Sequence, residues 1–449
     1  MTDVIIEDYQ QLVSYLEGGS KPIYEWRIGT EHEKFGYIKK NKKPLKYFGE
    51  NGISSILQGL VNLGWKPVYE ENNIIALSFG QQSITLEPGG QLELSGAPLD
   101  NIHETCREVN SHLSQLKSVS EKMGIGFIGI GFHPKLRVDE VPLMPKSRYK
   151  IMKEYMPLVG ELGQHMMKRT CTNQVNLDYS SEEDMKEKYR LMLNLEGIAT
   201  AIFANSPFDN KKLSPYKSLR SHFWHYTDKN RTGLLPFVFK KDFNFEKYVE
   251  YALDIPMYFI VRDHKYINMT NYTFRDFFEN KYKNNKLIEP TMDDWINHLS
   301  TLFPQVRLKQ FLEIRSMDAC SWDVICSQPA FWIGLLYNEA SFDKAKDLVE
   351  GWTNDDRSYI NKIAPKEGLQ AKFKEGTILD VAQKLFEISK QGLDNRNILA
   401  RNKKYNETFY LKDLESNLSS GQAPADILID KFNTKWNKDI NKVYSEHIF

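Results

Sequence analysis

The sequence predicts an α+β fold in which one large sheet has an apolar face covered by helices and an opposite polar face. Several strand-like segments alternate apolar and charged residues, which separates their side chains onto two faces. Segments with helical periodicity lie between and after these strands. No internal repeat and no Pro-, Gly- or Ser-rich linker divides the 449 residues. We therefore expect one domain that spans residues 1–449.

Local signals place the elements along the chain. Asp100 can cap a helix that Gly124 ends, and Gly64 ends an earlier helix. A Pro- and Gly-punctuated segment, residues 206–242, is rich in Arg, His and aromatic residues, and a long loop of this kind is usually functional. The expected helices are 4–17, 53–64, 101–123, 148–156, 181–204, 244–253, 291–302 and 324–351. The expected strands are 23–38, 66–79, 83–96, 125–132, 170–179 and 305–316.

Four of these strands carry a polar face. The residues that share this face are Glu25, Arg27, Glu31 and Glu33 in the first strand, Gln91, Glu93 and Ser95 in the second, Gln174, Asn176 and Asp178 in the third, and Arg307, Lys309, Glu313 and Arg315 in the fourth. An antiparallel sheet with one solvated face gives the same alternation. Carboxylates, amides and arginines clustered next to glycines and prolines favour a functional face instead.

One stretch, SITLEPGGQLELSGAPL, breaks a strand with a rigid turn. Glu87 and Glu93 flank Pro88, Gly89 and Gly90 in this stretch. Glycines let a backbone approach a ligand closely, and proline stiffens the turn. We expect both carboxylates to address one site.

The polar face has the donor atoms of a magnesium and phosphate site. Mg²⁺ prefers oxygen ligands from one or two carboxylates together with phosphate and water. Glu31 and Glu33 place two carboxylates on one side of a strand, a spacing that suits two ions bridged by a phosphate. Arg315 shares a face with Glu313 and is suited to bind a phosphate oxygen. No Walker-type or Rossmann glycine motif is present, so any ATP is expected to lie on the sheet.

Composition narrows the class of protein. The 59 basic and 59 acidic residues cancel, which argues against nucleic acid and membrane-surface partners. No run of about 20 apolar residues is present, as a membrane-spanning helix requires. Four cysteines form neither a secreted disulfide framework nor a zinc spacing, and the N-terminal residues lack the features of a signal or transit peptide. We therefore expect a cytoplasmic protein.

Histidines contribute weaker signals. His32 alternates with Glu31 and Glu33, so it is expected on the apolar side of its strand. His222 and His225 lie three residues apart but lack a third zinc ligand.

Ordered motifs carry a family resemblance. They are EWRIGTEHEKFGY, ITLEPGGQLELSGAP, GIGFHP, MPKSRYKIM, RTCTNQVNLDY, SLRSHFW, DKNRTGLLPFVF and QFLEIRSMDA. The sequence resembles glutamate–cysteine ligases of the plant and proteobacterial type from about residue 20 to 340, with a bland helical region at about 341–449. The resemblance implies a curved, mostly antiparallel sheet that forms a funnel with helices outside, like glutamine synthetase and the guanido kinases. It also implies ATP-dependent joining of glutamate to cysteine through a γ-glutamyl phosphate, with two or more Mg²⁺ ions.

The resemblance also implies residue roles. The expected metal ligands are Glu31, Glu33, Glu87, Glu93 and Glu313, with Glu33 and Arg315 in catalytic roles. The expected substrate-binding residues are Arg148, Arg220, Arg231, Gln174 and Asn176. The implied partners are glutamate, cysteine and ATP, and the implied assembly is a monomer or a homodimer. Cys106 and Cys326 lie in contexts that resemble a redox-sensitive plant pair, so both a reversible disulfide and two buried thiols stay open.

Three alternative functions remain at this point. The first is a ligase with the same chemistry and another amine acceptor. The second is a non-catalytic binding protein on the same scaffold, which the intact carboxylates disfavour. The third is a guanido kinase, which is expected to carry a reactive-cysteine loop that this sequence lacks.

Overall fold

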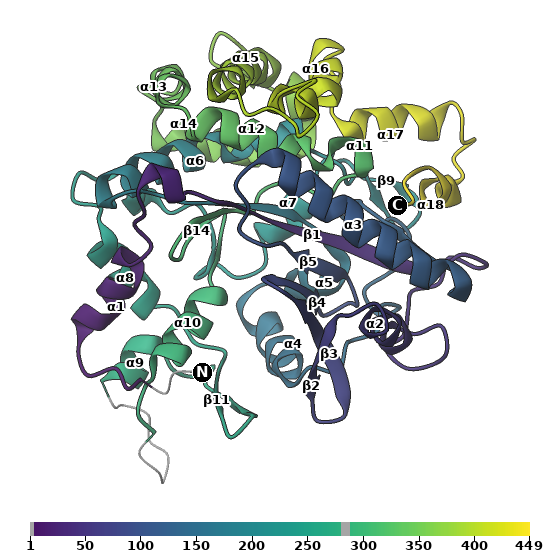
Figure 1. Cartoon of the computed structure of the whole chain (residues 1–449), viewed down its shortest axis with the longest axis horizontal. Helices are drawn as coiled ribbons and strands as arrows, with labels where there is room; N and C mark the ends of the chain where they lie inside the picture. The colour runs from purple at the N-terminus through teal and green to yellow at the C-terminus, as the bar shows by residue number, and fades with distance from the viewer. Residues whose placement is uncertain (1–3, 280–287) are drawn as a thin grey trace.

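A nine-stranded sheet organises the computed structural model, which describes residues 4–279 and 288–449. The strand order is β14-β15-β7-β1-β5-β4-β3-β2, and β6 pairs with the far end of β1 (Figure 1). The strands are β1 Ile28–Ile38, β2 Lys66–Glu70, β3 Asn73–Phe79, β4 Gln82–Leu86, β5 Leu92–Ser95, β6 Ile125–Ile128, β7 Asn173–Leu177, β14 Val306–Leu308 and β15 Leu312–Ile314. Neighbouring strands of this sheet run antiparallel, which confirms the predicted α+β class.

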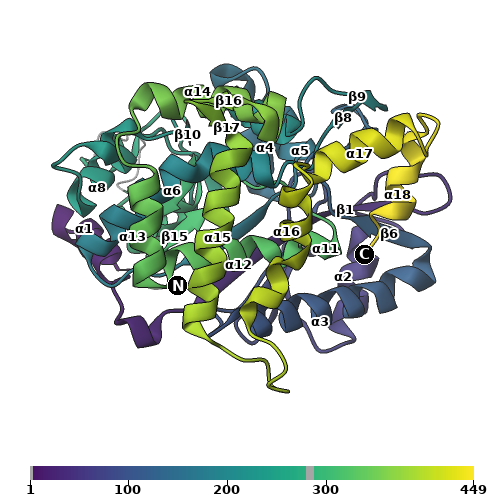
Figure 2. The same ribbon diagram turned by 90° about the horizontal axis from the view of Figure 1, so that it is seen from above.

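Helices gather on both sides of the sheet. Seen from above, α15 and α16 lie outermost over α6 and α12 (Figure 2). The helices are α1 Tyr9–Glu17, α2 Ile53–Val61, α3 Ile102–Ser120, α4 Ser147–Val159, α5 Gly163–Arg169, α6 Glu182–Ile202, α7 Leu219–Trp224, α8 Phe245–Leu253, α9 Phe274–Phe278, α10 Met292–Ser300, α11 Trp322–Ile325, α12 Ser327–Leu336, α13 Glu339–Leu348, α14 Asn354–Glu367, α15 Ile378–Arg396, α16 Lys412–Ser419, α17 Pro424–Asn433 and α18 Val443–Glu446. Short strand pairs complete the fold: β8 Phe208–Asp209 with β9 Lys212–Leu213, β10 Thr232–Gly233 with β13 Phe303–Pro304, β11 Phe259–Arg262 with β12 Lys265–Asn268, and β16 Lys372–Phe373 with β17 Gly376–Thr377.

The apolar face of the sheet packs on the largest core. Val175 and Leu177 of β7 and Leu312 and Ile314 of β15 are fully buried there, together with residues of α6, α12 and α15. The side chains between them in sequence, such as Gln174 and Glu313, therefore point to the other side, as the alternation predicted. His32 is likewise buried on the apolar side of β1.

The register of β1 brings distant polar residues together. Glu31 stands opposite Ser95 of β5 and Gln174 of β7, and Glu33 stands opposite Glu93 of β5. Because strand partners lie a few ångströms apart, residues that are more than 140 positions apart in sequence share one small area.

Several expected elements differ from the structure. The segment 66–79 forms the hairpin β2–β3 and not one strand, the segment 324–351 is divided into α11, α12 and α13, and β1 begins at Ile28 and not at residue 23. The N-cap of α3 is Asn101, next to the predicted Asp100. The segment 305–316 forms the hairpin β14–β15 and not one strand, with a turn at Lys309–Phe311 that contains neither Gly nor Pro. The alternation has the same phase on both sides of this turn, so one strand was expected, although Gln310 and Phe311 interrupt the pattern at the turn itself. The segment 206–242, expected to be a loop, contains the short helix α7, whose Ser218 cap accepts a hydrogen bond from the Ser221 amide.

Two further expectations concern membrane-spanning helices and the pairing of the cysteines. Among the helices of the described residues, none is long and apolar enough to cross a bilayer. A disulfide joins Cys106 on α3 to Cys326 at the start of α12, with Cα atoms 6.0 Å apart. The structure thus contains the cystine that the sequence left open, while Cys171 and Cys320 are buried thiols.

Candidate active site

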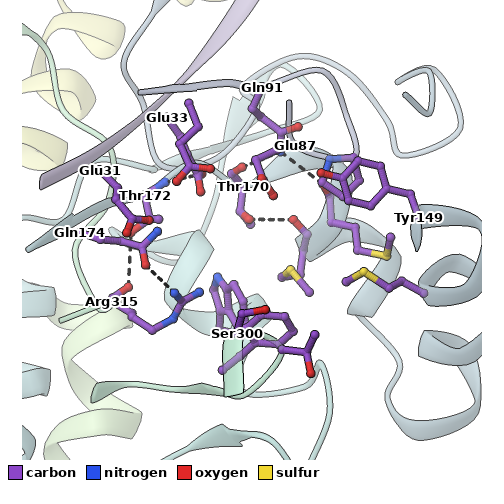
Figure 3. A pocket seen from close by; sticks show the side chains of 18 of the residues that line it. Glu31, Glu33, Glu87, Gln91, Tyr149, Thr170, Thr172, Gln174, Ser300 and Arg315 are labelled. Atoms are coloured by element: carbon purple, nitrogen blue, oxygen red, sulfur yellow. Dashed lines mark hydrogen bonds between the residues drawn. The ribbon is translucent and has the colours of Figure 1, made fainter. Parts of the chain in front are cut away.

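A pocket of about 220 Å³ lies over the polar face of the sheet (Figure 3). The sheet supplies its carboxylate wall, and α4, α5, α7, α10 and β11 supply the opposite walls. Eight of the predicted site residues line it: Glu31, Glu33, Glu87, Glu93, Arg148, Gln174, Arg220 and Arg315. The sequence-based grouping of these residues is therefore reproduced in space, whereas their chemical roles stay predictions.

The Pro-Gly-Gly turn connects β4 to β5 and directs two carboxylates into this pocket. Gly90 has a positive φ of 83°, which favours glycine. A Cβ atom on Gly89 would lie 2.4 Å from the Lys168 carbonyl oxygen at the end of α5. The turn is therefore packed tightly against α5. Glu87 points into the pocket (Figure 3), and Glu93 also lines it.

Glu31, Glu33 and Glu93 repel one another electrostatically. Burial, followed by Glu313 and Glu93, raises the pKa of Glu31 to about 8. Burial, followed by Glu87 and Glu93, raises the pKa of Glu33 well above its usual value. Burial and then Glu87 raise the pKa of Glu93. Such mutual repulsion is the condition that a bound cation relieves.

Neutral donors orient these carboxylates without neutralising them. The Thr172 amide donates to Glu33 Oε2 at 2.8 Å, and the Asn176 side-chain amide donates to Glu31 Oε1 at 3.1 Å. The Thr85 hydroxyl donates to Glu93 Oε2 at 3.0 Å. Asn176 itself is not among the residues that line the pocket, so it acts on the pocket through Glu31.

The oxygen-rich set fits a hard divalent cation. Four carboxylates line one pocket, and oxygen is the donor that Mg²⁺ prefers. Within residues 4–279 and 288–449, however, no three acidic, His or Cys side chains converge into a preformed metal site. The donor chemistry therefore fits Mg²⁺, while its coordination geometry would form on binding.

Glu313 occupies a different environment from the other carboxylates. Its oxygens accept from Arg307 Nη2 at 2.6 and 2.9 Å and lie 3.1 Å from Lys309 Nζ. Arg315 also donates to it. Burial raises its pKa, but these three cations together hold the pKa of Glu313 well below its usual range. Glu313 is not among the lining residues, so the structure gives its predicted role as a metal ligand no support.

The predicted arginines divide into pocket residues and one structural residue. Arg220 is 3% exposed and donates to the carbonyl oxygens of Arg315 at 2.7 Å and Ser316 at 3.1 Å. Arg315 donates to Gln174 (Figure 3) and also to Glu313. Arg231, by contrast, is fully buried against Asp228, with Nε 2.7 Å from its carboxylate, and lies outside the pocket. The structure therefore does not support the substrate role predicted for Arg231.

Sequence reasoning missed the apolar wall of the pocket. This wall consists of Tyr149, Met152, Met166, Met167, Trp224, Phe259 and Phe303. Most of these residues come from helices or from a short hairpin, where apolar residues are indistinguishable by sequence from core residues. The motifs MPKSRYKIM and SLRSHFW, which contain Tyr149, Met152 and Trp224, were the only available signal.

The fold and the pocket together define a class of protein. An antiparallel sheet that presents carboxylates and arginines to one pocket is suited to an enzyme that handles anionic substrates with a divalent cation. The sequence model of glutamate-cysteine ligase family 2 (GCS2) matches residues 27–446. The chain therefore belongs to this family.

Individual relatives agree with the family match. The chain is 50% identical over 441 residues to a protein of Oryza sativa subsp. japonica named glutamate–cysteine ligase A, chloroplastic, a match that covers 98% of this chain and 88% of that protein. It is 47% identical to glutamate–cysteine ligase, chloroplastic, of Arabidopsis thaliana, over 98% of this chain and 83% of the relative. A crystal structure of glutamate–cysteine ligase from Francisella tularensis in complex with AMP shares the fold, with a TM-score of 0.56, 14% identity and coverage of 95% and 90% of the two chains.

The comparisons correct one prediction. A cytoplasmic location was expected from the N-terminal residues, but the relatives from rice, tobacco and Arabidopsis are named chloroplastic. The cytoplasmic prediction is therefore wrong. The prediction rested on the composition of the N-terminal residues, and the location of a protein in the cell is not encoded in how its folded chain packs.

Proposed function

We propose that the protein is an ATP-dependent glutamate–cysteine ligase, which makes γ-glutamylcysteine for glutathione synthesis. The observation that carries this conclusion is the family match over residues 27–446, together with relatives of this name that are 50% identical over nearly the whole chain. The pocket agrees with it, because carboxylates face arginines over a sheet that lacks a P-loop. ATP is the phosphoryl donor, and L-glutamate and L-cysteine are the other substrates.

The reaction has two steps. A γ-carboxylate oxygen of glutamate attacks the γ-phosphorus of ATP, ADP leaves, and γ-glutamyl phosphate forms. The neutral amine of cysteine then attacks the acyl carbon, the C–O bond to phosphate breaks, and inorganic phosphate leaves. The amine nitrogen gives up one proton to solvent and keeps the other as the amide N–H. The first step is needed because a carboxylate oxygen is a poor leaving group until it carries a phosphoryl group.

We assign the following roles to the pocket residues. Arg148 and Arg220 hold the carboxylates of the amino-acid substrate, and Arg315 holds a phosphate oxygen. Gln174 fixes Arg315 in place through their hydrogen bond. Glu31, Glu33, Glu87 and Glu93 would hold Mg²⁺, which neutralises phosphate charge when it is bound. The ion pairs of Glu313 suggest to us that it positions Arg315 instead of binding metal directly.

The proposal also includes the shape of the sheet and the number of domains. The curved sheet is expected to form a funnel like that of glutamine synthetase, with the pocket inside it. The chain is expected to act as one catalytic domain, because the C-terminal helices α12 and α15 pack on the same core as the sheet.

Product analysis tests the function. The purified protein is incubated with Mg-ATP and L-glutamate alone, then with L-cysteine, and then with a panel of other amines. Release of ADP that cysteine stimulates, together with γ-glutamylcysteine, supports the proposal. Stimulation by another amine keeps the mechanism and changes the acceptor. No glutamate-dependent ADP release under any condition contradicts the proposal.

A further inference from the structure

The backbone on both sides of Glu87 is held by a single segment, Met144–Tyr149. Lys146 Nζ donates to the Leu86 carbonyl oxygen at 3.0 Å, and the Tyr149 hydroxyl donates to the same oxygen. The Met144 amide donates to the Pro88 carbonyl oxygen at 2.9 Å. Both carbonyl groups that flank Glu87 are thus fixed by residues at the start of α4.

Lys146 has no role in the proposed reaction, yet it is buried. Its side chain is 8% exposed, and it is not among the residues that line the pocket. Among the described residues, the Nζ atom of Lys146 hydrogen-bonds to the Leu86 carbonyl oxygen alone and lies 5.4 Å from the centre of the Tyr149 ring, and it forms no ion pair with a carboxylate. A buried amine with a single backbone partner costs folding free energy, so its position calls for a functional reason.

The same segment carries a predicted substrate arginine. Arg148 Nη2 lies 3.2 Å from the Tyr149 hydroxyl, which in turn donates to Leu86. Arg148 Nε is buried without a partner. A continuous set of hydrogen bonds therefore runs from the Arg148 guanidinium to the residue that precedes Glu87.

The other side of the turn has little freedom to move. Gln91 Nε2 donates to the Thr170 carbonyl oxygen at 2.8 Å, and Gly89 packs against Lys168. The Ser147 amide donates to Glu70 on β2 at 2.7 Å, which anchors the segment to the sheet. A movement of Arg148 should therefore move Glu87 as well, because the turn that follows Glu87 cannot move independently of the segment.

We propose that Lys146 is a positioning residue that, with Tyr149, couples amino-acid binding at Arg148 to cation binding at Glu87. The inference rests on the proposed function, because it takes glutamate as the ligand of Arg148 and Mg²⁺ as the ligand of Glu87. Because these contacts hold the segment and the turn together, binding of either ligand places the other site in the position that the second ligand requires. Coupling of this kind is reciprocal between the two ligands.

Isothermal titration of the full-length protein with L-glutamate, in the presence and absence of Mg²⁺, tests the coupling. In the wild-type protein, Mg²⁺ is expected to raise the glutamate affinity about 10-fold. Lys146→Met keeps the length of the side chain and removes the donor, and it is expected to reduce this factor below about 3-fold. Lys150→Met is the matched control, since Lys150 is an exposed lysine of the same helix, and it should keep the full factor.

A purely structural role for Lys146 lowers the melting temperature and leaves the ratio of the two affinities unchanged, which overturns the inference. Tyr149→Phe removes the second donor to Leu86 and keeps the ring, so it supplies the same test if Lys146→Met does not fold. Wild-type protein that binds glutamate with no effect of Mg²⁺ also overturns the inference, while the ligase assignment stands. Wild-type protein that binds no glutamate at all overturns the ligase assignment, and the coupling with it.

Discussion

Glu33 on β1 and Glu93 on β5 stand directly opposite each other in the sheet. Like charges at opposed strand positions are destabilising. The direct hydrogen bonds of the pair come from neutral donors, the Thr172 amide and the Thr85 hydroxyl. Fold stability alone does not explain two carboxylates at such positions, and the proposed cation site would account for their placement.

Glu33→Gln should abolish turnover and preserve the fold. The substitution keeps the shape and the hydrogen bond from Thr172 but removes the charge, so ATP turnover should fall at least about 100-fold. Steady-state ADP release and circular dichroism measure the two effects. Glu25→Gln, the same change at an exposed position before β1, should keep wild-type activity. An active Glu33→Gln protein would remove Glu33 from the metal site.

The stability of the metal-free protein should depend on Glu31. Its pKa of about 8 in the folded state lies above its ordinary value of 4.5, so the folded state binds the proton more tightly. The contribution of Glu31 to stability is therefore favourable at low pH and is lost as the pH rises between these two values. The loss has a slope of up to about 1.4 kcal/mol per pH unit.

Urea unfolding in EDTA between pH 5 and pH 7 measures this slope. Glu31→Gln should give a flatter profile than the wild-type protein. Groups whose pKa does not depend on Glu31, such as Lys34 with a pKa lowered to about 8 by burial, titrate equally in both proteins and cancel in the difference. Identical slopes would contradict the prediction.

Arg220→Lys should weaken glutamate binding. Lysine keeps the charge but has no planar fork, so the apparent KM for glutamate should rise about 10- to 100-fold. The carbonyl oxygens of Arg315 and Ser316 also lose donors, which should cost about 1–3 kcal/mol of unfolding free energy. Arg231→Lys, a buried arginine outside the pocket, should lower stability and leave the KM unchanged. A changed KM in Arg231→Lys would restore the substrate role first predicted for it.

Sequence periodicity predicted which residues share a face but not which residues meet. Alternation placed Glu31, Glu93 and Gln174 on polar faces, because a strand has a period of two. It did not give the register that sets Glu31 beside Gln174, since register depends on the packing of whole strands and on turn geometry. The family motifs, and not the alternation within single strands, predicted that these residues form one site.

Two predicted site residues lie outside the pocket for a common reason. Arg231 and Glu313 lie in motifs as specific as those of the pocket residues, yet each is paired with an opposite charge in the folded chain, Arg231 with Asp228 and Glu313 with Arg307. Asp228 is three residues from Arg231, but the carbonyl oxygens that complete its shell come from Pro256 and Thr301. A motif therefore identifies an important residue without separating a ligand-binding role from a structural one.

Gly89→Ala should misplace the turn that carries Glu87. The added Cβ atom would lie 2.4 Å from the Lys168 carbonyl oxygen, so the turn or α5 must move. A displacement of about 1 Å at a reacting group reduces the rate by about 100-fold. Turnover measurements on Gly89→Ala and Gly80→Ala provide the comparison. Gly80 has a φ of 60° and open space around it, so its substitution should cost about 1 kcal/mol and keep the activity.

Glu313→Gln should act first on stability. Arg307, Lys309 and Arg315 surround this carboxylate, and the removal of one partner from a buried charge cluster costs about 3–5 kcal/mol. Urea unfolding should show this loss in metal-free protein, where a role limited to metal binding would have no effect. Replacement of Arg307 by Met in the same protein removes one excess cation, so the double variant should be more stable than the two single losses added together. A Glu313→Gln protein of wild-type stability that no longer binds Mg²⁺ would instead return Glu313 to the metal site.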